Sequence, residues 1–373
     1  MYRPSTIQEL ASQIREHRGP LLPRGSGSHQ ALGNAARADS TVIDTTQLRV
    51  VSDYIPSDLT ITVGAGITLG ALQELLKPNN QWLPWDAPQH HSATIGGLLA
   101  AGLSGPLRHS AGTPRDWVLG MHTVTGDGRI IKSGGKVVKN VAGYDMHKLH
   151  IGALGTLGVI AEVSFKIAPL PNADQSLSFV CRDLAHAHTL AYQLRERPFN
   201  PAALLIHTDA NGVVTLLARW TGVTAMVARQ VAHALQQAST YDDYETRAWE
   251  PLLNEPFSTS TRTQVRIGVP AQHMAAVIPL LQRHVGRAAA IQLLPTVGLV
   301  RLFGVAADDV VDLRAKLSPY TGYAVVEVGE HPDRWGPAPA GVAIMEQLKR
   351  SWDPDDKLNP GRGFIAARAR TER

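Results

Sequence analysis

Cysteine is almost absent from this chain of 373 residues, in which Cys181 is the only one. A single cysteine cannot form an internal disulfide, and it cannot supply the several thiolates of a zinc or iron–sulfur site built by this chain alone. Any iron–sulfur cluster that takes part in its chemistry would therefore belong to a partner.

Long apolar segments are also missing. The longest near-continuous apolar run, residues 93–103, is about half the roughly 20 residues that a membrane-spanning helix needs, and it contains three glycines. No secretory signal opens the chain, because residues 5–18 are polar and amphipathic. These features predict a cytoplasmic protein, whose contact with the inner face of a membrane would be made only through partners.

The chain lacks a strong charge of either sign. Its net charge of +4, from 36 basic and 32 acidic residues, is too small to indicate a nucleic-acid-binding surface. The C-terminal end does carry Arg362, Arg368, Arg370 and Arg373. This tail is either solvated or in contact with a phosphate, an acidic partner or an anionic lipid surface.

Glycine, by contrast, is concentrated between residues 93 and 160, which hold 14 of the chain's 33 glycines. Glycine weakens helices and strands, so such a cluster indicates tight turns or a close approach of the backbone to another group. A large, flat, anionic cofactor is a group of this kind.

The N-terminal part alternates between helical and strand patterns. Thr6 and Glu9 have the spacing of a capping box, and Gly19-Pro20 ends the helix that they begin. A Gly-Asp-Gly turn at 126–128 predicts a hairpin, and strict alternation predicts a strand at 159–167. Further strands are expected at 21–23, 41–44 and 59–63, and a short helix at 68–76.

Two segments begin like the phosphate-binding motifs of nucleotide-binding proteins, but neither motif is complete. Gly25-x-Gly27 begins like a Rossmann fingerprint, but Gln30 stands where the third glycine belongs, and 29–40 has no apolar stripe for a crossover helix. Gly134-Gly135-Lys136 is followed by Val137, where a phosphate-binding P-loop needs a hydroxyl. Taken alone, the loop after residue 23 is therefore an ordinary surface turn.

The order of the motifs carries more information than any one of them. The chain contains in turn Arg-Gly-Ser-Gly-Ser at 24–28, Thr-Ile-Gly-Gly at 94–97, Arg-Asp-x-Val-Leu-Gly at 115–120, Lys-Asn-Val-Ala-Gly-Tyr-Asp at 139–145, Gly-Thr-Leu-Gly-Val-Ile at 155–160 and Asn-Pro-Gly-Arg at 359–362. This series resembles the FAD-linked oxidases of the p-cresol methylhydroxylase (PCMH) and vanillyl-alcohol oxidase type. Within that group it is most similar to the E subunits of bacterial glycolate oxidases. The resemblance covers 1–170 densely and 350–365 clearly, and it is thin between them.

The resemblance and the sequence patterns together predict an α+β fold in three parts. Residues 1–170 would form a PCMH-type FAD-binding domain of two subdomains, and 336–373 would return to it. Strand and helix patterns between Pro171 and the prolines of 331–339 predict an α/β cap with an antiparallel sheet over 171–335. The expected cap strands are 213–220, 264–269, 291–294, 300–304 and 323–328, and the expected cap helices are 225–237, 272–284 and 308–317.

The resemblance implies which backbone segments hold FAD. Two loops would wrap its pyrophosphate, and their residues are Gly25, Ser26, Gly27, Ser28, His29, Ala93, Thr94, Ile95, Gly96 and Gly97. Gly102, Ser104, Gly112 and Thr113 would line the route to the flavin ring, Gly158, Val159 and Ile160 the adenine end, and Asn359 and Arg362 the flavin side. Some relatives bind flavin covalently through a histidine in the first loop, but Ser28 takes that position here and His29 follows it. FAD is therefore expected to be non-covalent.

Arg108 and Arg115 are the candidate cations beside FAD, for a phosphate or for the flavin N1 and C2 carbonyl. Alternatively, Arg115 pairs with Asp116 or Asp145 and fixes a loop. His331 is a candidate base, or else a solvated loop histidine before Pro332. No His-x-His pattern accompanies it, so no catalytic residue is assigned and no metal is expected; His90 and His91 are expected to face solvent.

Three functions remain open. The favoured one is an FAD-binding subunit of a glycolate (2-hydroxy acid) oxidase or dehydrogenase complex, which carries electrons between a catalytic flavin subunit and an iron–sulfur subunit. The second is a self-sufficient FAD-dependent dehydrogenase of D-lactate or glycolate. The third is an assembly scaffold in which FAD is bound without turning over.

Overall fold

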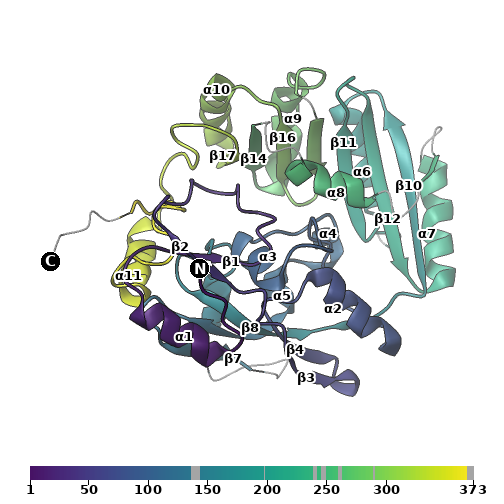
Figure 1. Ribbon diagram of the computed structural model, residues 1–373. Coiled ribbons are helices and arrows are strands. Elements are labelled where there is room, and N and C mark those ends of the chain that lie inside the picture. Colours follow the sequence, from purple (N-terminus) through teal and green to yellow (C-terminus); the bar gives the residue numbers. More distant parts are fainter. Residues whose placement is uncertain are drawn as a thin grey trace. The chain divides into compact units, whose positions relative to one another are not determined.

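The computed structural model describes residues 1–135, 143–196, 198–237, 242–244, 249–258, 263–288 and 290–367. Parts of the sequence motifs lie outside these residues, namely Lys136 and Val137, the 139–142 part of the motif at 139–145, and the tail residues Arg368, Arg370 and Arg373. The chain divides into two compact units (Figure 1). Unit 1 comprises Met1–Ser104, Thr113–Leu170 and Pro337–Arg373, and unit 2 comprises Gly105–Gly112 and Pro171–Gly336.

Unit 1 begins with helix α1 (Ile7–Glu16), whose N-terminus is capped by Thr6. The hydroxyl of Thr6 accepts the N–H of Glu9 at 3.1 Å, as the sequence predicts, and the carboxylate of Glu9 accepts backbone N–H groups of Ser5 and Thr6. The buried face of the helix packs in one core with β1 (Leu21–Arg24) and β2 (Thr41–Asp44), which pair in parallel. Leu358 belongs to the same core and forms a parallel bridge to Leu21.

Unit 1 also contains a five-stranded antiparallel sheet, in the order β3-β4-β8-β6-β7, and a two-stranded sheet of β5 and β9. The predicted hairpin joins β6 to β7, and β8 alternates between buried Val163 or Phe165 and half-buried Glu162 or Ser164, which confirms both predictions. The strands of unit 1 other than β1 and β2 are β3 (Val51–Ile55), β4 (Thr60–Gly64), β5 (Gln81–Trp82), β6 (Val118–Val124), β7 (Ile130–Gly134), β8 (Val159–Lys166) and β9 (Ala168–Pro169). Its helices other than α1 are α2 (Leu69–Leu76), α3 (Ile95–Ala101), α5 (Pro114–Trp117) and α11 (Val342–Trp352), with 3-10 turns at Pro56–Asp58, Lys77–Asn79 and Met146–Leu149.

Unit 2 is an eight-stranded antiparallel sheet in the order β13-β10-β12-β11-β15-β16-β14-β17, which confirms the predicted antiparallel cap sheet. Its strands are β10 (Ala173–Cys181), β11 (Ala203–Thr208), β12 (Val214–Gly222), β13 (Asp242–Tyr244), β14 (Gln264–Gly268), β15 (Ala290–Leu294), β16 (Leu299–Phe303) and β17 (Tyr323–Val328). Its helices are α4 (Arg108–Ala111), α6 (Leu184–Leu194), α7 (Thr224–Gln237), α8 (Trp249–Ser258), α9 (Met274–Gln282) and α10 (Ala307–Leu317), with 3-10 turns at Ala271–His273 and Ser318–Tyr320. One core joins the sheet to α6, α7, α9 and α10.

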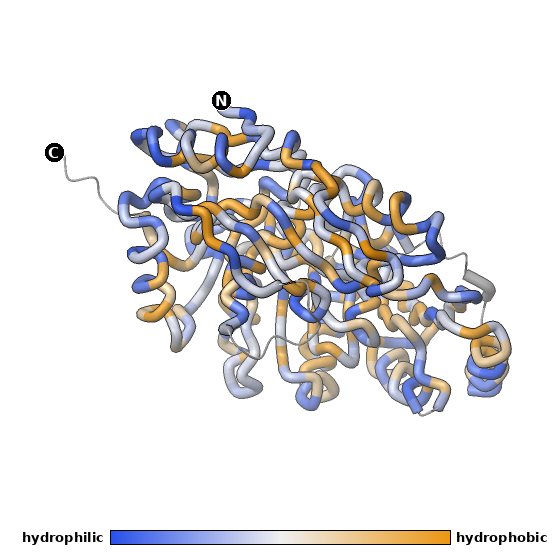
Figure 2. The backbone as a smooth tube through the Cα atoms, turned by 90° about the horizontal axis from the view of Figure 1, so that it is seen from below, coloured by the Kyte–Doolittle hydropathy of each residue, from blue (hydrophilic) through white to orange (hydrophobic). Residues whose placement is uncertain are grey.

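Segment 105–112 lies in the chain between two stretches of unit 1, yet it packs with unit 2. The ring of His109 explains this, because its Nδ1 lies 2.6 Å from the Thr296 hydroxyl and its Nε2 lies 3.1 Å from Oδ1 of Asn200. Hydrophobic and hydrophilic stretches alternate along the backbone (Figure 2). Within the described part of the chain, no helix has the length and apolar character needed to cross a bilayer.

Cys181 lies in the core of unit 2, and burial raises the pKa of its thiol to about 11. We expect a disulfide reagent at pH 8 to label the folded chain at least about 100-fold more slowly than the chain unfolded in guanidinium chloride, because the thiolate is the reactive form. The measurement is the labelling rate in the two conditions. Prompt labelling of the folded chain at one thiol per chain would contradict the burial of Cys181.

Candidate functional site

Two cavities with shared walls lie in unit 1, and together they are called the glycine pocket here. Both are lined by Pro23, Arg24, Gly25, Gly97, Ala100 and Leu154. The first cavity adds Ser26 to Gln30, Ala93, Thr94, Ala101, Asn359 and Arg362. The second adds Thr45, Gly96, Gly155, Gly158, Val159 and Ile160. The pocket therefore collects four of the segments whose motifs stood far apart in the sequence.

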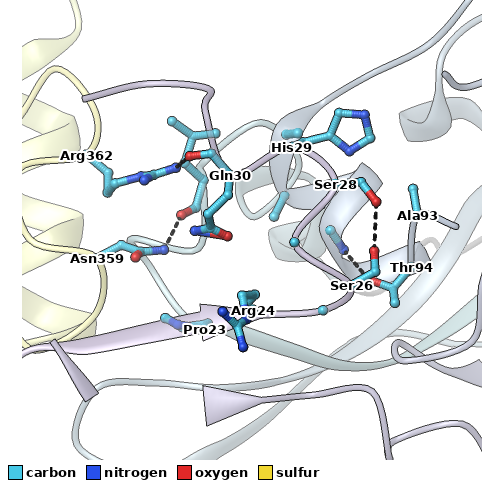
Figure 3. A pocket seen from close by; sticks show the side chains of 16 residues that line it. Pro23, Arg24, Ser26, Ser28, His29, Gln30, Ala93, Thr94, Asn359 and Arg362 are labelled. Carbon is cyan, nitrogen blue, oxygen red and sulfur yellow. Dashed lines mark hydrogen bonds between the residues drawn. The ribbon is translucent and has the colours of Figure 1, made fainter. Parts of the chain in front are cut away.

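The two loops at the first cavity need glycine because they touch each other. A Cβ atom on Gly25 would lie 2.0 Å from the hydroxyl oxygen of Thr94, so any other residue would push the loops apart. Thr94 is the N-cap of α3 and accepts the N–H of Gly97 at 3.3 Å. In the first of these loops, the hydroxyls of Ser26 and Ser28 are 2.9 Å apart (Figure 3).

The wall of the second cavity is the start of β8. A Cβ atom on Gly158 would lie 2.9 Å from Cε1 of His150, so this glycine lets the strand pass over a buried imidazole. His150 is 4% exposed, and none of the described residues forms a hydrogen bond with its Nδ1. Burial, with a smaller repulsion from His147, lowers the pKa of His150 to about 4. The imidazole beneath this wall is therefore neutral near pH 7.

The fourth segment comes from the C-terminal part of the chain. The side-chain amide of Asn359 donates to the Leu154 carbonyl at 2.7 Å, and Arg362 donates to the carbonyls of Gln30 and Leu32 at 3.0 and 2.7 Å (Figure 3). Asn359 has a φ of 44°, a left-handed conformation that asparagine tolerates better than most residues. Both side chains are buried, so they help to build the pocket wall.

Most of the residues that the resemblance implied for FAD line this pocket, but seven do not. Ile95 is buried in the core, and Gly102, Ser104, Thr113 and Arg115 lie in unit 1 outside the pocket. Arg108 and Gly112 belong to unit 2. Among the described residues Arg115 forms no ion pair with Asp116 or Asp145; it donates instead to the Ile151 carbonyl at 3.2 Å. Asp116 instead accepts from Thr113, and Asp145 pairs with Lys148.

Sequence reasoning missed several lining residues. Arg24 and Gly155 were inside the quoted motifs and could have been named from them. Thr45 follows β2, and Leu154 takes a left-handed φ of 53°, and neither has a local sequence signal. Their places in the pocket depend on how distant segments pack.

Arg108 lines a separate cavity in unit 2, called the arginine pocket here, of about 270 Å³. Arg266 and Tyr323 also line it, and the Arg266 guanidinium lies 5.6 Å from the centre of the Tyr323 ring. Nε of Arg266 lies 2.9 Å from Glu327, which pairs equally closely with Arg301. One carboxylate thus faces two half-buried guanidinium groups.

His331 lines neither the glycine pocket nor the arginine pocket. Its Nδ1 accepts the N–H of Asp333 at 3.0 Å, and the residue is half-buried. His90 is half-buried and His91 is exposed, and their rings are 4.0 Å apart.

A family model described as an FAD binding domain matches residues 2–134. The chain is also 30% identical over 371 residues to the Glycolate oxidase subunit GlcE of Escherichia coli, with 96% of each chain covered. It belongs to the GlcE family. Members of this family are FAD-binding oxidoreductases, so FAD is the cofactor of this chain.

Other relatives match only part of the chain. The Glycolate oxidase subunit GlcD of Bacillus subtilis is 31% identical over 171 residues, which cover 46% of this chain and 36% of that protein. A D-lactate dehydrogenase of Archaeoglobus fulgidus is 30% identical over 171 residues, which cover 45% and 38%. A solved alkyldihydroxyacetonephosphate synthase has a TM-score of 0.70 at 17% identity, over 96% of this chain and 75% of that one, and shares the fold.

Proposed function

We propose that this chain is the FAD-carrying subunit of an assembly that oxidises glycolate or a similar 2-hydroxy acid. In this assembly it passes electrons between a catalytic flavin subunit and an iron–sulfur subunit. One observation carries the proposal: the similarity to GlcE extends over 96% of both chains, whereas the similarity to GlcD and to the D-lactate dehydrogenase is limited to 171 residues. The single cysteine agrees with a cluster held by a partner.

The glycine pocket is the proposed FAD site, and its lining fits an anionic dinucleotide. None of the described residues that line it carries a carboxylate, while Arg24 and Arg362 bring positive charge. Backbone N–H groups of 25–29 would hold the pyrophosphate, since turns of successive N–H groups bind anions. The segment 93–97 would contribute mainly its shape, because the N–H groups of Ala93, Ile95, Gly96 and Gly97 already donate within the chain. Gly158 to Ile160 would offer backbone to the adenine. FAD, when bound, supplies the reversible electron chemistry, and the chain supplies its binding and orientation.

We further propose that FAD is non-covalent, with Ser28 at the position where a covalent linkage would need a histidine. The assembly would lie in the cytoplasm and contact a membrane only through partners. Gel filtration in denaturant tests the linkage, because FAD should then leave the chain completely.

The test of the function is an anaerobic visible absorption spectrum of the FAD-loaded chain. We expect the flavin band to persist when glycolate or D-lactate is added, and to bleach when the partner subunits are then supplied. A band that stays oxidised throughout turnover of the complete assembly would contradict electron transfer through this chain and favour a scaffold.

A second candidate function is oxidation of the acid by this chain alone. The arginine pocket favours it, because Arg108, Arg266 and Tyr323 line it together and a guanidinium has further N–H donors for a carboxylate even where Glu327 already accepts from Nε of Arg266; about 270 Å³ accommodates a small acid. Bleaching of the flavin by glycolate or D-lactate without partners would support this function. Arg266→Gln should then raise the acid concentration needed for half-maximal bleaching, and the matched variant Arg283→Gln, in another surface pocket of unit 2, should not.

A further inference from the structure

Lys349 of α11 is buried in the interior of unit 1, with 3% of its surface exposed. Its ammonium group donates to the carboxylate of Asp353 at 2.5 Å and to the carbonyls of Leu358 and Thr156 at 2.9 and 3.0 Å. A carboxylate oxygen of Asp356 lies 3.1 Å away. A buried ammonium is costly unless it is fully paired, and here oxygen atoms occupy its surroundings.

The two carbonyls belong to different walls of the glycine pocket. Thr156 follows Leu154 and Gly155, which line the second cavity, and Leu358 precedes Asn359, which lines the first. One ammonium group therefore hydrogen-bonds to the backbone next to both walls. The bond from Asn359 to the Leu154 carbonyl joins the same two walls on the pocket side.

Asp353 fixes the C-terminal wall further. It is fully buried, and its carboxylate accepts the backbone N–H groups of Lys357 and Leu358 at 2.9 and 2.8 Å. Gly126 leaves room for it, because a Cβ atom there would lie 2.0 Å from the Asp353 carboxylate. This turn leads directly into Asn359, whose left-handed backbone is sustained only if its surroundings hold it.

We propose that Lys349 is a positioning residue of the FAD site, which with Asp353 sets the separation of the 154–158 and 358–362 walls and so the retention of FAD. Lys349 acts through these walls and does not itself touch the cofactor. The inference rests on the proposal that the glycine pocket holds FAD.

The test compares FAD binding by the full chain with Lys349→Met, which keeps the length of the side chain but removes its donors. We expect the Kd for FAD to rise about 10- to 100-fold, as the loss of two wall-holding hydrogen bonds implies, and FAD to leave the folded protein faster. Lys316→Met is the matched control, since Lys316 forms an exposed i,i+4 pair with Asp312 in unit 2. This control should keep the Kd of the unmodified chain.

A second variant separates positioning from stability. Lys349→Met leaves Asp353 buried without its cation, so it also lowers the free energy of unfolding. The double variant Lys349→Met with Asp353→Asn removes that unpaired charge together with one of the two acceptors for the N–H groups of Lys357 and Leu358. It should recover part of the stability of the apo-chain, while FAD still dissociates faster. Unchanged dissociation from the folded double variant would overturn the proposal. Unchanged FAD binding in a variant that fills the glycine pocket would instead show that FAD lies elsewhere.

Discussion

Replacement of Gly97 by aspartate is expected to abolish FAD retention, with a Kd raised at least about 100-fold. Gly97 lines both cavities of the glycine pocket, and a Cβ atom there would meet only the Thr94 hydroxyl oxygen, at 3.1 Å. The backbone can therefore accept the new side chain with a small adjustment. Its carboxylate would occupy the space proposed for the pyrophosphate and repel it, and two like charges about 4 Å apart cost several kcal/mol near a protein surface.

Gly97→Asp tests the proposed FAD site more specifically than Gly96→Asp. A Cβ atom on Gly96 would lie 3.0 Å from Cβ of Ala65 and 3.2 Å from its carbonyl, so Gly96→Asp would disturb packing as well as FAD. Gly341→Asp is the control, because nothing lies within 4 Å of a Cβ atom there and the residue does not line the pocket. The measurements are the ratio of flavin to protein absorbance after gel filtration and the melting temperature of the apo-chain. Normal flavin content in Gly97→Asp would remove the glycine pocket as the FAD site.

Local signals in the sequence predicted much of this pocket. Gly25 and Gly158 lie where a loop touches another loop or passes over a buried side chain, and Gly27 and Gly155 have positive φ, so these places favour glycine. A residue that must be glycine leaves a recognisable pattern, and the order of several such patterns identifies a family. The same holds for 359–362, where the left-handed Asn359 and Gly361 mark a turn.

The burial of Lys349, which supports the pocket walls, could not be predicted from a local sequence pattern. Helix α11 turns Ile344 and Met345 to solvent, 66% and 38% exposed, while Lys349 is buried. The apolar periodicity of α11 predicts the reverse, with Ile344 and Met345 buried and Lys349 exposed, because such a prediction assumes that charged side chains point outward. Only the oxygen atoms supplied by Thr156 and Leu358, far apart in the chain, make a buried ammonium acceptable. Segment 105–112 was likewise assigned by its neighbours in sequence, whereas His109 binds it to unit 2.

Acid is expected to destabilise unit 1 through His150. The folded chain disfavours the charged imidazole, since burial lowers the pKa of His150 to about 4 from an ordinary 6.5. The unfolded chain therefore takes up this proton first as the pH falls below 6.5. Stability that is present above pH 6.5 is lost progressively down to about pH 4, and the full loss from this group is about 3 kcal/mol. Below pH 4 both states are protonated and the contribution of His150 no longer changes.

The position of His150 connects this titration with the cofactor. Its ring stacks on Trp352 with centroids 5.1 Å apart, next to Asp353, and Gly158 of the glycine pocket passes over it. Urea unfolding at pH 7 and pH 5 should show a loss of about 2 kcal/mol that shrinks to near zero in His150→Gln, apart from the contributions of other groups. His91→Gln, at an exposed histidine, should keep the full loss. Equal losses in His150→Gln and the unmodified chain would mean that another group senses the acid. If protonation of His150 causes this loss of stability, FAD should also dissociate faster from the unmodified chain between pH 7 and pH 5. The reason is that a charged His150 would displace the backbone at Gly158, which lines the glycine pocket.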